Sequence, residues 1–326
     1  MTAPHATLPA RPRRVIVLGL DDDALATLRE AAPSLELLGA PDLSRARAWI
    51  DDAEAILGWI TPEVVRRGRA LRWVHLFAAG VERFCTPELA AAPIVVTCER
   101  GIHGAAVADH AMALLLGLTR GLAPALRPQA ARTWNREPPP RLLELAGRRA
   151  VIVGFGGIGQ AIAARARAFG LRIVAVAREA RPAPEGVDRV VGRRDLEEAL
   201  DGAEVLFLAA PLTEETQGRI DDAALARLAR GALVINVGRG GLVDHDALTR
   251  ALSSGHLGGA GLDVTHPEPL PEDHPLWSRE DVLLTPHVAG LSDRVMARRL
   301  ELAADNLRRF AAGEALRGVV DPRVGG

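Results

Sequence analysis

The sequence predicts an α/β protein with two doubly wound parallel-sheet domains. Short apolar runs that are typical of buried strands alternate with helical stretches along most of the chain. The chain has 326 residues, which is enough for two domains with separate cores. A glycine-rich turn at residues 154–159 joins one apolar run to an amphipathic stretch, and this strand–turn–helix pattern favours the doubly wound class.

The first third of the chain contains one such alternating unit. Its expected strands are residues 14–18, 35–38, 55–57, 73–76 and 94–96, and its expected helices are residues 22–31, 43–50 and 62–68. Residues 1–12 contain three prolines and are expected to form a loose tail. A turn at Ala79 and Gly80 follows the fourth strand, where parallel sheets bind ligands. Its backbone N–H groups could hold a carboxylate, and a plain turn is the alternative.

A strongly apolar stretch, residues 102–121, predicts a helix that joins the two domains. The proline-rich residues 122–141 are expected to form a connecting loop. Further strands are expected at residues 150–153, 171–177, 204–210, 232–236, 258–264 and 282–284, and helices at residues 221–230, 244–254 and 291–312. The last helix is expected to return to the first domain, so that residues 1–101 and 291–326 form one domain and residues 102–290 the other.

The glycine-rich turn has the G-x-G-x-x-G spacing of a dinucleotide-binding site. Gly154 permits the tight turn, Gly156 leaves room for a pyrophosphate, and Gly159 lets the helix approach the sheet. Gly157 and Ile158 open the helix, whose free N–H groups can hold the pyrophosphate. A glycine-rich turn in an ordinary βαβ unit is the alternative. The flanking strands and helix favour the dinucleotide site, so this domain is expected to be a Rossmann-type cofactor domain.

The next strand ends in Ala177 and Arg178, where an NAD-preferring site carries an acid. An apolar residue leaves room for a 2′-phosphate, and a guanidinium can pair with one. The sequence therefore favours NADP(H) over NAD(H). The alternative is that Glu179 performs the role of the acid.

Composition excludes several classes of function. The formal net charge is −1, so no global field attracts nucleic acid or an anionic membrane. Neither Cys85 nor Cys98 belongs to a metal or redox motif, and no metal is expected. The N-terminus has no signal-peptide pattern, and no apolar run is long enough to span a bilayer. A cytoplasmic protein is expected.

Three polar residues stand after successive strands of the second domain. Arg239 follows residues 232–236, Glu268 follows residues 258–264, and His287 follows residues 282–284. An arginine can grip a substrate carboxylate, and a histidine can give or take a hydroxyl proton. A carboxylate on the far nitrogen of the histidine would orient the ring. Beside a nicotinamide these groups would form a workable hydride-transfer site, although each alone could also be an ordinary structural residue.

The chain resembles the D-isomer-specific 2-hydroxyacid dehydrogenase family. The matching segments, in the family's order, are VADHA at 107–111, GFGGIG at 154–159, PLTEETQG at 211–218, NVGRGGLVDHDAL at 236–248, GLDVTHPEPLPEDHPLW at 261–277 and TPHVAG at 285–290. The resemblance implies an NAD(P)-dependent enzyme that transfers hydride to and from small 2-keto and 2-hydroxy acids. It also implies a flavodoxin-like substrate domain and a homodimer.

The resemblance also implies roles for individual residues. Arg239 binds the carboxylate and carbonyl of the substrate, His287 is the general acid–base, and Glu268 is its carboxylate partner. Ala79 and Gly80 match a loop whose amides hold the substrate carboxylate. The implied cofactor contacts outside the glycine turn and Ala177–Arg178 are Pro211, Thr213, Val237, Gly238, Asp263 and Gly290.

A reductase of glyoxylate- or hydroxypyruvate-like acids is the function that these features favour. His103 replaces an asparagine that many relatives carry, and a C-terminal regulatory domain is not expected. Glu268 replaces the glutamine of formate dehydrogenases, which argues against formate. Two alternatives stay open: a phosphite dehydrogenase on the same scaffold, and a dinucleotide-sensing protein like the corepressors of this fold.

Overall fold

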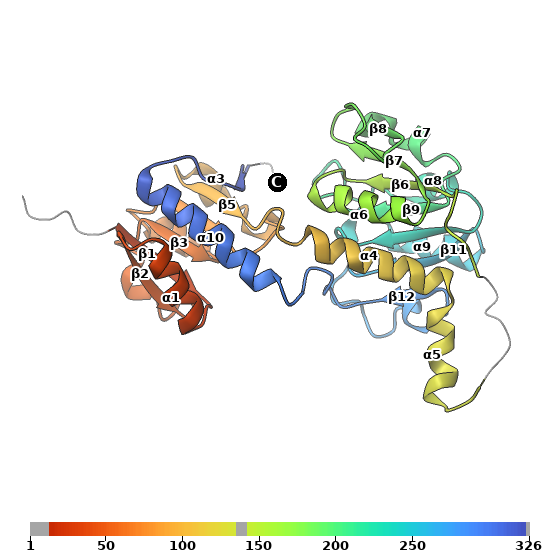
Figure 1. Ribbon diagram of the computed structural model, residues 1–326, viewed down its shortest axis with the longest axis horizontal. Coiled ribbons are helices and arrows are strands. Elements are labelled where there is room, and N and C mark those ends of the chain that lie inside the picture. The colour runs from red at the N-terminus through yellow and green to blue at the C-terminus, as the bar shows by residue number, and fades with distance from the viewer. Residues whose placement is uncertain (1–12, 135–141, 324–326) are drawn as a thin grey trace, which may run out of the picture. The chain divides into compact units, whose positions relative to one another are not determined.

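The computed structural model describes residues 13–134 and 142–323 (Figure 1). The chain forms two compact units. The first contains Met1–Ile102 and Asp293–Gly326, and the second contains His103–Ser292. The tail predicted at residues 1–12 lies outside the described residues.

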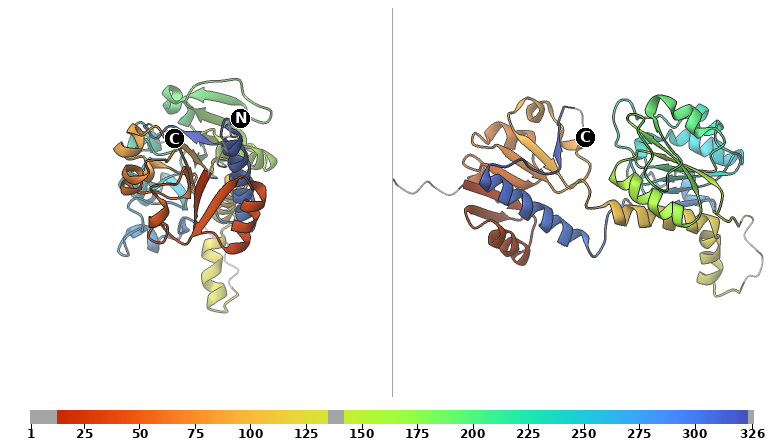
Figure 2. Two further views of the ribbon diagram at one scale, coloured as in Figure 1. Left: turned by 90° about the vertical axis from the view of Figure 1, so that its left-hand side faces the viewer. Right: turned by 45° about the horizontal axis from the view of Figure 1, so that its top comes forward.

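The first unit is a six-stranded sheet with helices on both faces (Figures 1 and 2). Its strand order is β13-β5-β4-β3-β1-β2, and all neighbouring strands are parallel except β13 and β5. The strands are β1 (Arg13–Leu18), β2 (Leu35–Ala40), β3 (Ala55–Gly58), β4 (Trp73–Leu76), β5 (Val95–Cys98) and β13 (Val319–Val320). Among the described strands of this unit, the two-residue antiparallel β13 departs from the predicted parallel sheet.

Two helices cover one face of this sheet. They are α1 (Asp22–Ala31) and α10 (Val295–Ala312). Their residues Leu28 and Leu307 are fully buried. The opposite face carries α2 (Pro62–Arg67) and α3 (Pro87–Ala91). The C-terminal helix α10 thus packs beside α1 in the first unit. The helix predicted at residues 43–50 is wrong, because only Arg47–Trp49 is helical and forms a short 3-10 turn. Asp42 accepts hydrogen bonds from the N–H groups of Ser44 and Arg45, which holds this segment as turns.

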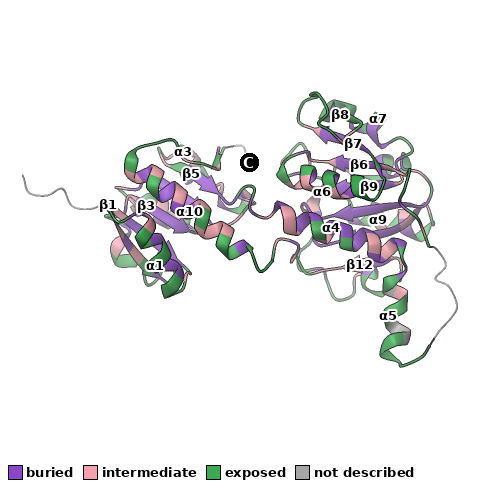
Figure 3. Cartoon of the chain, in the orientation of Figure 1, coloured by how far each residue is buried: buried purple, intermediate pink, exposed green. Residues whose placement is uncertain are grey.

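The second unit is a seven-stranded, all-parallel sheet in the order β12-β11-β10-β9-β6-β7-β8. Its strands are β6 (Arg149–Val153), β7 (Arg172–Ala177), β8 (Arg189–Gly192), β9 (Val205–Leu208), β10 (Ala232–Asn236), β11 (Leu257–Leu262) and β12 (Val282–Leu284). Figure 3 shows that these strands are mostly buried, as expected for a sheet that is covered on both faces.

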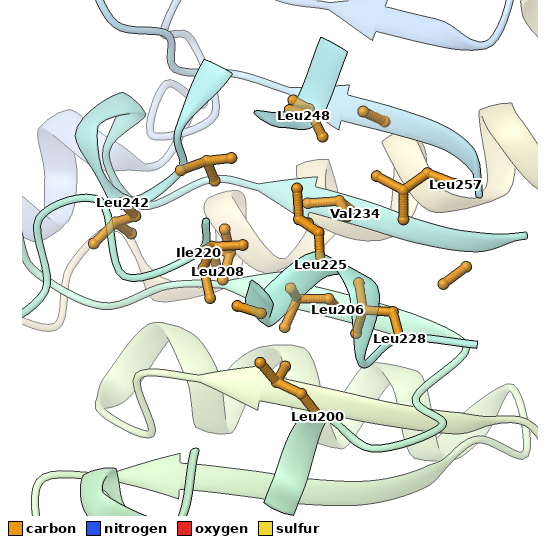
Figure 4. Close-up of a cluster of buried hydrophobic side chains, with 14 of the residues drawn as sticks. Leu200, Leu206, Leu208, Ile220, Leu225, Leu228, Val234, Leu242, Leu248 and Leu257 are labelled. Carbon is orange, nitrogen blue, oxygen red and sulfur yellow. The ribbon is translucent and has the colours of Figure 1, made fainter. Parts of the chain in front are cut away.

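Two helical layers cover the second sheet. One layer holds α4 (Gly104–Thr119) and α6 (Gly157–Ala168), and the other holds α7 (Leu196–Leu200), α8 (Asp222–Ala226) and α9 (His245–Ser253). Figure 4 shows Leu200 and Leu225 of the second layer in one buried cluster with Leu206 of β9. The connections of β6 and β9 leave toward opposite faces, which makes their shared carboxyl end a switch point where ligands bind.

The connecting loop predicted at residues 122–141 is wrong in its first part. Leu122–Ala130 forms the helix α5, which projects away from the sheet (Figures 1 and 2). Pro124 lies in the first turn of α5. N–H groups in a first turn make no intrahelical hydrogen bond, so a proline there does not prevent a helix. Residues 135–141 lie outside the described part of the chain.

Candidate active site

The glycine turn lies at the switch point of the second sheet. Gly154 has φ +97°, and a Cβ there would lie 2.4 Å from the backbone nitrogen of Ala210. A Cβ at Gly159 would lie 2.0 Å from the carbonyl oxygen of Gly154. Both positions therefore need glycine for the fold itself. By contrast, a Cβ at Gly156 or Gly157 would meet no described atom within 4 Å.

This open space suits a dinucleotide. Gly156 caps α6 and Gly157 begins it, so the first N–H groups of the helix face the space that the two exposed glycines leave. An anionic pyrophosphate is stabilised at such a helix end. The residues present therefore fit an NAD(P) cofactor, with Ile158, half-buried, beside the turn.

The carboxyl end of β7 carries two arginines near the glycine turn. Ala177 is half-buried there, and Arg178 and Glu179 are exposed. Arg181, which the sequence analysis did not single out, donates a hydrogen bond to the carbonyl of Phe155 at 2.7 Å. Its guanidinium also lies over the Phe155 ring, 5.4 Å from the centroid. The cation after this strand is thus attached directly to the glycine turn.

A cavity of about 400 Å³ opens at the carboxyl ends of β6, β7 and β9. Its apolar wall includes Val153, Val176 and Leu208, the positions that flank the glycine turn in the sheet. Its rim carries three arginines and one glutamate, which are Arg193, Arg194, Arg219 and Glu215. An apolar slot with a cationic rim could accept the adenosine end of a dinucleotide. No motif in the sequence pointed to these arginines, because they come from segments far from the glycine turn.

The turn after β10 presents Arg239. Asn236 is fully buried, and its side-chain amide donates to the carbonyl of Arg239 at 2.9 Å. The Asn236 side-chain oxygen accepts from the N–H of Gly238 at 3.1 Å. The half-buried Arg239 guanidinium donates to the carbonyl of Gly238 at 2.7 Å. A buried amide thus fixes the backbone from which Arg239 projects, a role that the sequence analysis missed.

The structure brings Glu268 and His287 into contact. His287 donates from Nδ1 to the Glu268 carboxylate at 2.7 Å. The His287 side chain is 48% exposed, so the other ring nitrogen, Nε2, is left for a substrate. His287 also has φ +55°, a left-handed conformation that a residue other than glycine adopts only when its surroundings impose it. Such strain is common at functional sites.

Asp263 imposes this conformation. It is 2% exposed, and its backbone carbonyl accepts from the N–H of His287 at 2.8 Å. Its carboxylate accepts from the N–H groups of Val288 and Ala289, at 3.0 and 2.9 Å. Asp263 therefore binds the backbone of His287 and of the two residues that follow it.

Register brings the Arg239 turn and the His287 turn to the same edge. Asn236, Leu262 and Leu284, the last residues of β10, β11 and β12, are register partners across three adjacent strands. Gly240 lets the Arg239 turn pack against the loop before Glu268, because a Cβ there would lie 1.9 Å from the carbonyl oxygen of Thr265. Arg239, Glu268 and His287 thus lie on neighbouring loops.

The loop that carries Glu268 has a histidine support. His245, at the start of α9, is 8% exposed and donates from Nδ1 to the carbonyl of Val243 at 3.2 Å. Its Nε2 then accepts from the N–H of His266 at 3.3 Å. Burial lowers the pKa of His245, which favours the neutral ring that can accept this bond.

The remaining predicted site residues occupy loops at strand ends. Val237 is buried and donates from its N–H to the carbonyl of Leu208, next to the β9 loop. Within that loop, Pro211 and Thr213 are braced by Thr216, whose hydroxyl accepts from the N–H of Thr213 and donates to the carbonyl of Pro211, both at 2.8 Å.

Two further predicted positions lie on other turns. The carbonyl of Gly290, after the His287 turn, meets Nδ1 of His103 at 3.1 Å. In the first unit, Ala79 is exposed and Gly80 half-buried directly after β4.

Within residues 13–134 and 142–323 no group of three or more His, Cys, Asp or Glu side chains could hold a metal ion. No helix in the same residues is both long and apolar enough to cross a membrane.

Known proteins resemble this chain over most of its length. Residues 112–289 match the family "D-isomer specific 2-hydroxyacid dehydrogenase, NAD binding domain". A glyoxylate reductase of Korarchaeum cryptofilum is 35% identical over 285 residues, which cover 84% of this chain and 85% of the relative. The chain belongs to the D-isomer specific 2-hydroxyacid dehydrogenase family. It is accordingly an NAD(P)-dependent oxidoreductase.

Two solved structures of this family extend the likeness to the whole fold. A D-isomer specific 2-hydroxyacid dehydrogenase from Xanthobacter autotrophicus, in complex with NADPH and MES, is 30% identical with a TM-score of 0.81. The match covers 96% of this chain and 99% of that one. An NADPH-dependent glyoxylate/hydroxypyruvate reductase from Sinorhizobium meliloti, in complex with NADP and sulfate, is 26% identical with the same TM-score, over 96% and 100% of the two chains.

Proposed function

We propose that this enzyme reduces a small 2-keto acid of the glyoxylate or hydroxypyruvate type to the D-2-hydroxy acid, with NADPH as the preferred donor. The observation that carries the proposal is the 2.7 Å hydrogen bond from His287 Nδ1 to Glu268 on an exposed, strained turn. The glyoxylate reductase relative and the NADPH-dependent reductase structure support the substrate class.

His287 and Arg239 divide the work on the substrate. When the cofactor is bound, its nicotinamide supplies the hydride. Nδ1 of His287 is held by Glu268, so Nε2 is the nitrogen that donates a proton to the substrate oxygen. The planar guanidinium of Arg239 pairs with the substrate carboxylate and stabilises negative charge as it develops on the oxygen. The assignment of Ala79 and Gly80 to the same carboxylate stays a prediction.

The preference for NADPH rests on the end of β7. Ala177 provides no carboxylate for a ribose hydroxyl, and Arg178 and Arg181 follow it. Two of the similar structures hold NADPH or NADP, which supports this choice. The exposed Glu179 is the group that would favour NADH instead.

The proposal is tested by steady-state oxidation of NADPH and NADH with glyoxylate, hydroxypyruvate, pyruvate and phenylpyruvate. We expect turnover with NADPH and either glyoxylate or hydroxypyruvate. The double variant Arg178→Gln/Arg181→Gln should raise KM for NADPH about tenfold or more while KM for NADH changes little, because a charge-assisted bond to a phosphate contributes roughly 1.5–3 kcal/mol. Glu179→Gln is the matched control, and it should leave the NADPH preference intact.

Each opposite result has a defined meaning. Preference for NADH would contradict the cofactor assignment and leave the substrate class standing. Tight binding of NADPH without oxidation by any acid would contradict the reductase and favour a dinucleotide sensor. Oxidation of phosphite with NADP⁺ would favour a phosphite dehydrogenase instead.

We also propose that the enzyme is a homodimer, and that α5 contributes to the interface. Leu122 and Leu126 lie one turn apart on this projecting helix and are 54% and 59% exposed, and Trp134 beyond it is 87% exposed. Exposed large apolar side chains on and after a projecting helix are typical of an interaction surface. Leu122→Ser/Leu126→Ser should shift the mass measured by light scattering from two chains toward one. An unchanged mass would contradict the role of α5. The cytoplasmic location stays a prediction.

A further inference from the structure

A chain of hydrogen bonds links α4 to the turn that carries His287. Nε2 of His110, on α4, lies 2.8 Å from the hydroxyl oxygen of Thr285. That hydroxyl donates to Oδ1 of Asp263 at 2.6 Å. His110 Nε2 also lies 3.5 Å from the same carboxylate oxygen. The His110 side chain is 23% exposed, and Asp263 at the inner end is 2% exposed.

The donor and the acceptor in each of these hydrogen bonds follow from the number of protons available. Asp263 accepts from the N–H groups of Val288 and Ala289, so all its partners are donors, as an ionised carboxylate requires. The short contact to Thr285 must therefore use the single proton of the hydroxyl. Thr285 can then only accept from His110, so Nε2 of His110 carries a proton.

Asp263, the inner end of this chain of hydrogen bonds, fixes the backbone conformation of His287. Asp263 accepts from the backbone N–H groups of His287, Val288 and Ala289, and His287 has φ +55°. A change in the direction of the Asp263 carboxylate would shift the N–H groups of Val288 and Ala289 with it. Because Asp263 is almost fully buried, water is poorly placed to replace a lost partner.

We infer that His110 is a positioning residue for the reaction: its Nε2–H, relayed by the hydroxyl of Thr285, orients the Asp263 carboxylate and so holds His287 in its working position. This inference rests on the proposed role of His287. His110 need not touch the substrate or the cofactor for this purpose. Small misplacements of a reacting group cost up to about a hundredfold in rate, so the effect should be measurable.

Paired variants separate the relay from general packing. His110→Leu removes the donor, whereas His110→Gln keeps an N–H donor at about the reach of Nε2. Thr285→Val removes the hydroxyl at nearly constant shape, and Thr285→Ser restores it. With glyoxylate and NADPH, we expect the Leu and Val variants each to lower kcat about 10- to 100-fold with little change in KM. The Gln and Ser variants should stay within about threefold of the wild type, and the double variant His110→Leu/Thr285→Val should fall no further than either single one.

Nuclear magnetic resonance of ¹⁵N-histidine-labelled enzyme tests the same relay without turnover. The spectrum should show His110 with a protonated Nε2, and the ring signals of His287 should shift in His110→Leu but not in His110→Gln. If the wild type does not reduce the keto acids, the proposed function fails, and this spectrum still decides the relay. An unprotonated Nε2 on neutral His110, unchanged His287 signals in His110→Leu, or equal losses of kcat in the Leu and Gln variants would each overturn the inference.

Discussion

The two sheets share an architecture but differ in where their polar residues stand. In the second unit, Arg239 and His287 project from turns beyond the strands, and buried Asn236 and Asp263 fix those turns. In the first unit, His75 lies within β4 and is fully buried. A polar side chain becomes available for chemistry when a different, buried polar group holds its backbone and leaves the side chain itself accessible.

The buried polar residues of the first unit serve the fold instead. Thr97 accepts from the indole N–H of Trp73 at 2.9 Å and contacts Nδ1 of His75 at 2.8 Å. Glu99, also fully buried, forms an ion pair with Arg299 of α10. The Thr97 contacts join β4 to β5, and the Glu99–Arg299 ion pair fastens the returning helix α10 to the end of the sheet. Among the described residues, Nε2 of His75 is a buried side-chain atom without a hydrogen-bond partner.

The largest effect should follow a change to Arg239, the half-buried cation on the turn after β10. Arg239→Met removes the planar fork, and Arg239→Lys keeps the charge without it. Loss of one partner from a buried charge pair costs roughly 2–5 kcal/mol, so kcat/KM for glyoxylate should fall about 30- to 5,000-fold in the Met variant. Lysine should restore only part of this loss. Equal kcat/KM in the wild type and the Met variant would contradict the role of Arg239.

A second prediction concerns the pH dependence of the first unit. Burial lowers the pKa of His75 to about 4, with Arg299 adding to this effect and Glu99 opposing it. In the unfolded chain the pKa is about 6.5. Between these values the unfolded state binds a proton that the folded state does not, so the free energy of unfolding falls as the pH falls from about 6.5 to 4. The total loss is about 3 kcal/mol.

Urea unfolding followed by tryptophan fluorescence, at pH 7 and at pH 5, measures the part of this loss that falls between those two pH values. The indole of Trp73 lies 6.2 Å from the His75 ring, between centroids, and reports on the same cluster. His75→Asn removes the titrating group, so its free energy of unfolding should change less between the two pH values than that of the wild type. Parallel curves for the two proteins would show that His75 does not cause the pH dependence.

The smallest expected effect is that of alanine substitutions in the glycine turn. They distinguish a glycine that the fold needs from one that the cofactor needs. Gly156→Ala meets no described atom within 4 Å, so the melting temperature should stay unchanged. The added methyl should weaken NADPH binding about tenfold, because overpacking costs roughly 1–3 kcal/mol. Gly159→Ala should instead lower the melting temperature, since its Cβ would lie 2.0 Å from the Gly154 carbonyl. Both are measured by thermal unfolding and nucleotide titration, and a lower melting temperature for Gly156→Ala would contradict the distinction.

Local patterns were sufficient to predict most of the fold. The bounds predicted for α1 and β4 agree with the structure, and so does the position of the glycine turn. The helix α1 has apolar residues at the helical period and a clear N-cap, Asp21, and β4 is a short, mostly apolar run. The helix α5 was missed because Pro124 and Pro128 favoured a loop, although a proline in the first turn is compatible with a helix.

The site residues likewise divide into those that local sequence patterns predict and those that only the fold brings together. Strand ends and family motifs singled out Arg239, Glu268 and His287 directly. The supporting contacts could not be found in this way, because they join residues distant in sequence, such as His110 and Thr285, which are 175 positions apart. The arginines at the rim of the cavity were also not predicted, because only folding brings their segments to the end of β6.

The central claim is that His287, oriented by Glu268, transfers the proton. Its most direct test is NADPH oxidation with glyoxylate by the wild type and by His287→Ala, alongside NADPH titration of both proteins. We expect kcat to fall by about two orders of magnitude or more in the variant, the usual scale for a general acid, while its affinity for NADPH stays the same. An unchanged kcat with intact nucleotide binding would contradict the claim.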